Sequence, residues 1–245
     1  MFFSFLLILQ AAASAGEPPR YASCMNLATS DAEKGVAEAT AWRLDGGGMF
    51  ARQCLGVAYA NQQRWEAAAS AFEEAAREAQ AAGDARAPNY WAQAGNAWLA
   101  GNEPAKARAA LDAALADGRL TGQPLGEAHL DRARAMVALG DMEGARSELD
   151  RAIVHAPADP LGWLLSATLA RRQGDLKRAA ADITQALRLS GDDASVQLEA
   201  GNVAAAQGNE ADARTAWGRV IELAPGSALA NSARTALAQF GAVPN

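Results

Sequence analysis

Residues 54–76 read CLGVAYANQQRWEAAASAFEEAA, an alanine-rich stretch with helical character that also contains three less common features. Gly56 lies inside it, Tyr59 and Phe72 flank the alanines, and Cys54 opens it. Small residues let two helices approach closely, and a large side chain fills the space beside them. The stretch therefore predicts two packed helices joined by a turn, and such a unit needs neighbours to bury its faces.

A period of 34 residues runs through the C-terminal half of the chain. Gly140, Gly174 and Gly208 are each followed by Asp or Asn and are spaced 34 residues apart. Small residues, large apolar residues and helix breakers recur at fixed offsets from these glycines: Ala133, Ala167 and Gly201; Leu149, Ile183 and Trp217; Pro157, Gly191 and Pro225. Because Pro or Gly ends the second helix, each 34-residue frame predicts a helix, a turn and a helix.

This pattern resembles the tetratricopeptide repeat (TPR) family, whose 34-residue signature is W-x₂-L-G-x₂-Y…A-x₃-F…P. The opening stretch places Leu55-Gly56, Tyr59, Ala68 and Phe72 in the L-G, Y, A and F positions. The expected frames are 49–82, 88–121, 126–159, 160–193 and 194–227. The resemblance implies an all-α solenoid, a right-handed superhelix of about five repeats. Residues 16–48 are expected to form a degenerate helical cap, and residues 228–245 a capping helix and tail.

The first fifteen residues, MFFSFLLILQAAASA, form an apolar run that ends in an A-x-A cleavage pattern at Ala13-Ser14-Ala15. The run is shorter than the roughly 20 apolar residues of a transmembrane helix. We expect residues 1–15 to be a bacterial signal peptide, with the mature protein periplasmic or secreted and without a stable membrane span. The alternative is an ordinary buried or frayed N-terminal helix, since no Lys or Arg precedes the run.

The chain has two cysteines, Cys24 and Cys54. Export and an even cysteine count favour a disulfide bond between them. Cys54 lies on the first helix of the first frame, where the N-terminal cap must dock, so this bond is expected to join the cap to the first repeat. A zinc site is disfavoured, because the only histidines, His129 and His155, lie far from both cysteines in the sequence.

An enzyme is not expected from the remaining residues. The chain has no G-x-S-x-G nucleophile motif and no phosphate-binding glycine loop, and neither histidine has an acidic partner at catalytic spacing. We therefore predict no catalytic residues, no metal and no cofactor. The formal net charge of −6 also disfavours a nucleic-acid partner. The six tryptophans are expected to pack in the core rather than to form a ligand cage.

In TPR proteins the first helices of the pairs line a concave groove that binds peptides or partner helices, and the resemblance implies the same here. The expected groove residues are Asn96, Leu130, Arg134, Leu164, Thr168, Arg171, Arg172, Leu198 and Asn202. Side-chain amides can bind a peptide backbone, arginines can hold a carboxylate, and the leucine row can take apolar side chains. The alternative is that the leucines pack between helices and the arginines are solvated or paired with Glu199 and nearby acids.

The function expected from these observations is a non-enzymatic protein–protein interaction module, an envelope adaptor or assembly factor that binds a peptide or partner helix in the groove. The alternative is a structural or self-associating scaffold component of an envelope complex. An enzyme with a site on the N-terminal segment is a third possibility, which rests on no motif.

Overall fold

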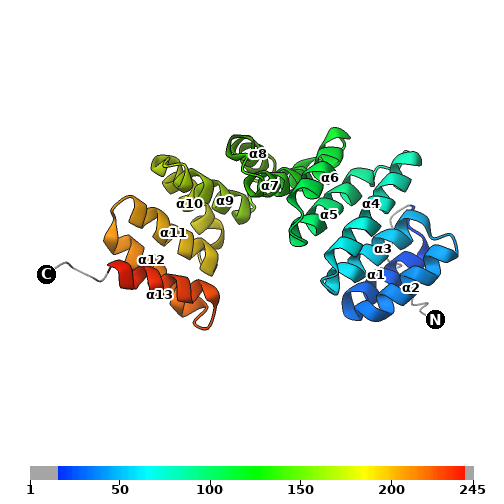
Figure 1. Ribbon diagram of the computed structural model, residues 1–245, viewed down its shortest axis with the longest axis horizontal. Coiled ribbons are helices and arrows are strands. Elements are labelled where there is room, and N and C mark those ends of the chain that lie inside the picture. The colour runs from blue at the N-terminus through cyan, green and yellow to red at the C-terminus, as the bar shows by residue number, and fades with distance from the viewer. Residues whose placement is uncertain (1–15, 241–245) are drawn as a thin grey trace, which may run out of the picture. The chain divides into compact units, whose positions relative to one another are not determined.

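The computed structural model describes residues 16–240, which fold into thirteen α-helices without a β-strand (Figure 1). The all-α prediction is confirmed. The helices are α1 (Pro19–Ser30), α2 (Ala32–Leu44), α3 (Gly48–Asn61), α4 (Trp65–Ala81), α5 (Ala87–Ala100), α6 (Pro104–Ala116), α7 (Gly122–Ala138), α8 (Met142–His155), α9 (Pro160–Arg172), α10 (Leu176–Ser190), α11 (Ala194–Ala206), α12 (Glu210–Leu223) and α13 (Ala228–Phe240). The predicted signal peptide, residues 1–15, lies outside the described residues.

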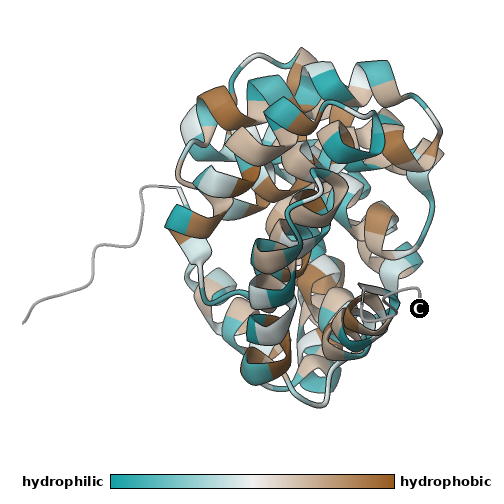
Figure 2. Cartoon of the chain, turned by 90° about the vertical axis from the view of Figure 1, so that its left-hand side faces the viewer, coloured by the Kyte–Doolittle hydropathy of each residue, from teal (hydrophilic) through white to brown (hydrophobic). Residues whose placement is uncertain are grey.

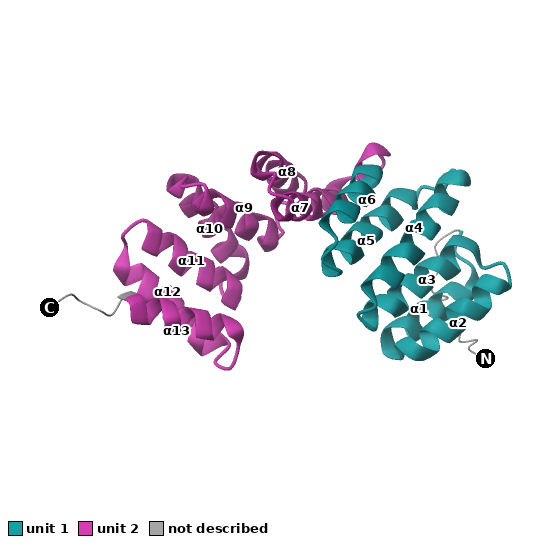
Figure 3. Ribbon diagram, in the orientation of Figure 1, with its two compact units in different colours: residues 1–114 teal, residues 115–245 magenta. Residues whose placement is uncertain are grey.

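The chain divides into two compact units, residues 1–114 and residues 115–245 (Figure 3). In the first unit, α1 packs on α2 and α3, and the packing continues from α3 to α4 and from α4 to α5. In the second unit, each helix from α7 to α13 packs on the next one in the chain. This consecutive packing fits a helical solenoid. Each expected frame contains one helix pair, but the division at 114/115 falls inside the frame 88–121, so the frame boundaries stay a prediction.

The Gly-Asp/Asn marker has a simple physical cause. Gly140, Gly174 and Gly208 have φ angles of 83°, 81° and 78°, in the left-handed region that glycine adopts without steric cost. The Asp or Asn that follows caps the second helix: the side chain of Asp175, for example, accepts a hydrogen bond of 3.0 Å from the backbone N–H of Arg178. Each marker therefore ends one helix and starts the next.

Close approach of paired helices explains the small residues of the frame. A Cβ atom on Gly56 would lie 2.5 Å from Cε1 of Phe72, and one on Gly201 would lie 2.4 Å from Trp217. The large residue of the second helix thus rests on the backbone of the first helix. Figure 2 shows apolar and polar residues alternating along single helices, as expected for helices that bury one face only.

Candidate functional site

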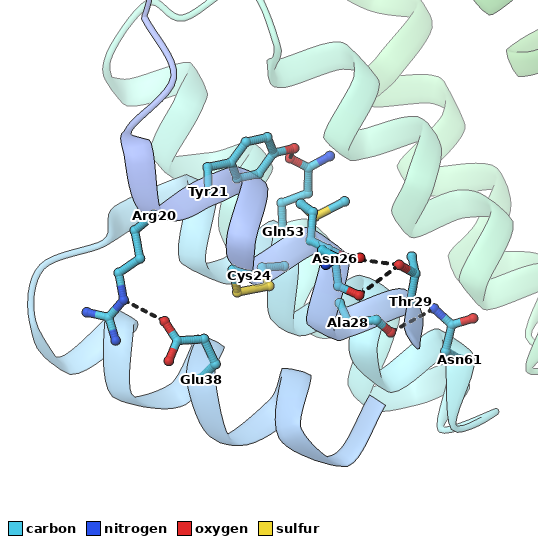
Figure 4. The surroundings of a disulfide bond; sticks show 11 residues. Arg20, Tyr21, Cys24, Asn26, Ala28, Thr29, Glu38, Gln53 and Asn61 are labelled. Carbon is cyan, nitrogen blue, oxygen red and sulfur yellow. Dashed lines mark hydrogen bonds and ion pairs between the residues drawn. A yellow bond between two sulfur atoms is a disulfide. The ribbon is translucent and has the colours of Figure 1, made fainter. Parts of the chain in front are cut away.

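The N-terminal helix pair is joined covalently to the next pair. Cys24 of α1 and Cys54 of α3 form a disulfide bond across a Cα–Cα distance of 6.1 Å, and both side chains are fully buried (Figure 4). The distance lies within the usual range for such bonds. The structure thus contains the cap-to-repeat bond expected from the sequence.

Hydrogen bonds surround the disulfide on the same helix contact. The Tyr21 hydroxyl donates to Oε1 of Gln53 at 2.6 Å, and Nδ2 of Asn61 donates to the backbone oxygen of Ala28 at 3.1 Å (Figure 4). Tyr21 also packs edge-on against Phe50, with ring centroids 5.3 Å apart. The first pair is therefore docked by covalent, polar and aromatic contacts together.

Cys54 is the sixth residue of its frame, and the sixth residues of the last two frames also face the preceding first helix. In the last frame this residue is Glu199, which is 6% exposed and forms a bidentate ion pair with Arg171 of α9. The Nε–Oε1 distance is 2.6 Å and the Nη2–Oε2 distance is 3.1 Å. In the frame before, the sixth residue is Leu165, and Val137 stands at the position of Arg171. The ion pair is thus replaced by two apolar side chains.

A pocket lies at this apolar contact, with a volume of about 190 Å³, and we name it the α7–α9 pocket. Its lining residues are Ala133, Arg134 and Val137 of α7, Leu149 of α8, and Leu165, Thr168, Leu169 and Arg172 of α9. The buried side chains of Ala133, Leu149 and Leu169 form its floor. Arg134 and Arg172 are exposed, and among the described residues that line the pocket none is acidic.

The polar groups of the α7–α9 pocket differ in the hydrogen bonds and ion pairs that they already form within the chain. Nη1 of Arg134 lies 2.7 Å from Oδ1 of Asp131, a surface pair that contributes little free energy. The Thr168 hydroxyl donates to the backbone oxygen of Leu164 at 2.9 Å and keeps its acceptor capacity. Guanidinium groups bind carboxylates through two parallel hydrogen bonds. The arrangement therefore suits an apolar side chain with a carboxylate beside it.

Three of the nine expected groove residues, Arg134, Thr168 and Arg172, meet at the α7–α9 pocket. The others lie elsewhere. Leu130 and Leu164 are buried among their own helix pairs, Leu198 packs against the cluster around Trp217, Arg171 and Asn202 contact Glu199, and Asn96 is on the surface of α5 in the first unit. A partner-binding role for each of the nine residues stays a prediction.

The pocket also contains Leu165, Leu149 and Leu169, which are not among the predicted groove residues. All three look like ordinary core residues when each is read alone. A comparison of the sixth frame residues would have singled out Leu165, because an apolar residue stands there where the next repeat has a buried acid.

His129 contacts a buried acid of the second unit, Glu148. Oε2 of Glu148 lies 2.7 Å from Nδ1 of His129, and Oε1 lies 3.1 Å from Arg132 and 3.0 Å from Arg151. Burial by itself raises the pKa of the Glu148 carboxyl, but the hydrogen bond from His129 and the charge of Arg132 outweigh it, so the pKa lies below its ordinary value. His129 is thus held in a structural contact with Glu148.

Two further properties of residues 16–240 bear on the class of protein. Their His, Cys, Asp and Glu side chains form no cluster of three or more that could hold a metal ion. None of the described helices combines the length and the apolar character that a bilayer crossing requires.

Comparison with known proteins gives a consistent picture. Two family models described as tetratricopeptide repeat match residues 126–169 and 164–228. No curated protein sequence matches the chain.

Solved structures share the fold at low sequence identity. PilW, a type IV pilus biogenesis factor, is 20% identical with a TM-score of 0.72, over 88% of this chain and 99% of that chain. PilF of Pseudomonas aeruginosa is 14% identical with a TM-score of 0.71, over 88% and 96%. YrrB, a TPR protein with an unusual peptide-binding site, is 18% identical with a TM-score of 0.58, over 80% and 96%. Residues 126–228 thus carry tetratricopeptide repeats, and the described chain shares the fold of these solved tetratricopeptide-type structures.

Proposed function

We propose that the chain is a protein–protein interaction module whose α7–α9 pocket binds an apolar side chain of a partner peptide with a carboxylate next to it. The observation that carries the proposal is the combination of an apolar floor with two exposed arginines and no acidic lining residue among those described. The repeat register supports it, because the equivalent contact one repeat later is closed by the Arg171–Glu199 pair.

The size of the α7–α9 pocket points to a single side chain. Pockets for drug-sized molecules measure roughly 300–1,000 Å³, whereas this one measures about 190 Å³. Burial of a leucine or phenylalanine side chain contributes about 1.5–3 kcal/mol. A carboxylate at the rim adds charge-assisted hydrogen bonds to Arg134 or Arg172. A peptide that ends in an apolar residue offers both groups at once.

The cellular setting that we propose is the bacterial envelope, as an exported adaptor or assembly factor. The buried Cys24–Cys54 bond supports it, because disulfide bonds persist in oxidising compartments. The apolar run 1–15 with its A-x-A pattern supports it as well. PilW is described as a pilus biogenesis factor and YrrB as having a peptide-binding site, so both kinds of role occur on this fold.

The test uses fluorescein-labelled hexapeptides that end in leucine, with either a free C-terminal carboxylate or a C-terminal amide. Fluorescence anisotropy with the full chain should show binding of the free acid at least about ten-fold tighter than binding of the amide, as expected for one charge-assisted hydrogen bond. The Arg134→Ala/Arg172→Ala variant should lose this preference. Arg171 stays unchanged, because its removal would leave the buried Glu199 carboxylate without its cation.

A matched control removes two exposed cations elsewhere in the second unit, Lys177 and Arg188, by substitution with alanine. This variant should keep the preference for the free acid. Equal binding of acid and amide to the unmodified chain would refute the proposal. A mass that rises with concentration in light scattering would instead favour the self-associating scaffold.

A further inference from the structure

A second pocket of the second unit has a volume of about 310 Å³ and lies among α10, α11 and α12. We name it the α10–α12 pocket. Its lining residues are Ala180, Ile183, Thr184 and Leu187 of α10, Gln197, Ala200, Val203, Ala204 and Gln207 of α11, and Asp212, Thr215 and Ala216 of α12. Ile183 and Val203 are buried in its floor, and Asp212 is the only charged residue among the described lining residues.

The equivalent place one repeat earlier, among α8, α9 and α10, is filled by the chain itself. Nη1 of Arg146 donates to the Ser166 hydroxyl at 2.7 Å, and Nη2 donates to the Ser166 backbone oxygen at 2.9 Å. Ser166 in turn donates to Asp182, which also accepts from Nε of Arg178 at 3.2 Å. Arg178 further pairs with Asp150. Ser166 is fully buried, so this network closes the groove.

The sequence explains why the next groove is open. The residues 34 positions after Arg146, Ser166 and Asp182 are all alanine: Ala180, Ala200 and Ala216. Thr184 stands in the place of Asp150, and Asp212 stands in the place of Arg178. The long side chain, the serine that accepts from it and the aspartate that accepts from that serine are thus truncated together. The apolar floor is kept, with Ile183 in the place of Leu149 and Val203 in the place of Leu169.

We propose that the α10–α12 pocket receives an arginine side chain from a partner protein, in the space that Arg146 and its partners fill one repeat earlier. The methylene stem would lie on Ile183 and Val203, as the stem of an arginine covers apolar surface. The guanidinium would reach the Asp212 carboxylate and the Thr184 hydroxyl at the rim. Both groups accept hydrogen bonds, and Asp212 supplies the opposite charge.

The chemistry of the pocket selects arginine over other side chains. A planar guanidinium can bond two oxygens at the same time, as Arg146 does with the hydroxyl and the backbone oxygen of Ser166. An acidic side chain would meet Asp212, and an apolar side chain would leave the Asp212 contact unused. This surface is independent of the α7–α9 pocket, whose rim carries the opposite charge.

The test uses synthetic alanine-based helical peptides with one central arginine, norleucine or glutamate. Amide chemical shifts of Ala200, Val203 and Ala204 in the full chain report binding. The arginine peptide should shift these signals saturably, with affinity at least about ten-fold above that of the norleucine peptide, the size of one charge-assisted contact. The glutamate peptide should cause no saturable shift.

A refilled variant, Ala180→Arg/Ala200→Ser/Ala216→Asp, copies the closed groove into the open one and should abolish binding of the arginine peptide. Asp212→Asn is a milder second variant at an exposed position and should reduce the affinity at least about ten-fold. The Arg134→Ala/Arg172→Ala variant should bind the arginine peptide normally, which separates this proposal from the function proposed above. Equal shifts by the arginine and norleucine peptides, or undiminished binding to both the refilled and the Asp212→Asn variants, would overturn it.

Discussion

Leu165 and Glu199 occupy the same position of consecutive repeats, yet one lines a pocket and the other is buried in an ion pair. Cys54 holds this position in the first repeat and forms the disulfide bond. In each case the residue contacts the first helix of the preceding pair. The repeat therefore determines where the contact occurs, and a single residue type determines whether it is covalent, ionic or open to a ligand.

In the grooves that involve the second helices of the same unit, the earlier groove is closed and the later one is open. The groove among α8, α9 and α10 is closed by Arg146 and its partners, whereas the one among α10, α11 and α12 is open. From one repeat to the next, the contact between first helices thus closes, while the groove beside the second helices opens.

The largest effect is expected at the Arg171–Glu199 pair. Arg171→Val leaves the Glu199 carboxylate buried without its partner, which should reduce the free energy of unfolding by about 3–5 kcal/mol. The double variant Arg171→Val/Glu199→Leu copies the residues of the α7–α9 contact and should recover most of this loss. Urea unfolding followed by circular dichroism measures both variants. A double variant that is no more stable than the single one would contradict the comparison.

The disulfide bond is the covalent case of the same contact. Replacement of both Cys24 and Cys54 by alanine should cost about 2–4 kcal/mol of unfolding free energy, because the bond closes a loop across 30 sequence positions. Unfolding with and without dithiothreitol measures the effect. The reductant should destabilise the unmodified chain and leave the double variant unchanged; an effect on both would point to a different cause.

A smaller effect on stability is expected at Gly201, which occupies the same repeat position as Ala167. Gly201→Ala places a Cβ 2.4 Å from the Trp217 ring and should cost about 1–3 kcal/mol through overpacking. One repeat earlier, alanine at the equivalent position packs in one cluster with the smaller Ile183. The double variant Gly201→Ala/Trp217→Ile should therefore be more stable than the single variant in thermal unfolding.

The pH dependence of stability tests the buried acid Glu148 of α8. The pKa of Glu148 is lower in the folded chain than its ordinary value of 4.5. Its contribution to stability is therefore complete above pH 4.5 and is lost as the pH falls through the lower folded value. Urea unfolding between pH 6 and pH 3 should show a shallower loss of stability for Glu148→Gln than for the unmodified chain. Parallel curves would exclude Glu148 as the source.

The fold could be predicted well from the sequence because the repeating small and large residues are the ones that pack between paired helices. A glycine on one helix and a large aromatic residue on the next fit together only when the two helices are in contact. The structure shows this contact for Gly201 with Trp217 and for Gly56 with Phe72. The turn glycines are equally direct, since their left-handed backbone is costly for other residues.

The candidate site was predicted only in part, for a geometric reason. Arg171 and Arg172 are neighbours in the sequence but point about 100° apart around the helix, so one meets Glu199 and the other reaches the pocket rim. Whether a groove is open depends on side-chain volumes from several helices at once, as with Ala180, Ala200 and Ala216. A pattern within one frame does not contain this information, whereas a comparison between frames does.

The bond between Cys24 and Cys54 also changes what a cut in the chain would do. All of α2 and the exposed turn around Leu44 to Gly46 lie inside the closed loop. A protease that cleaves this turn would produce two polypeptides that remain one molecule, and they would separate only in a reducing medium. In an oxidising medium, the N-terminal helix pair is thus protected against loss by cleavage at this exposed turn.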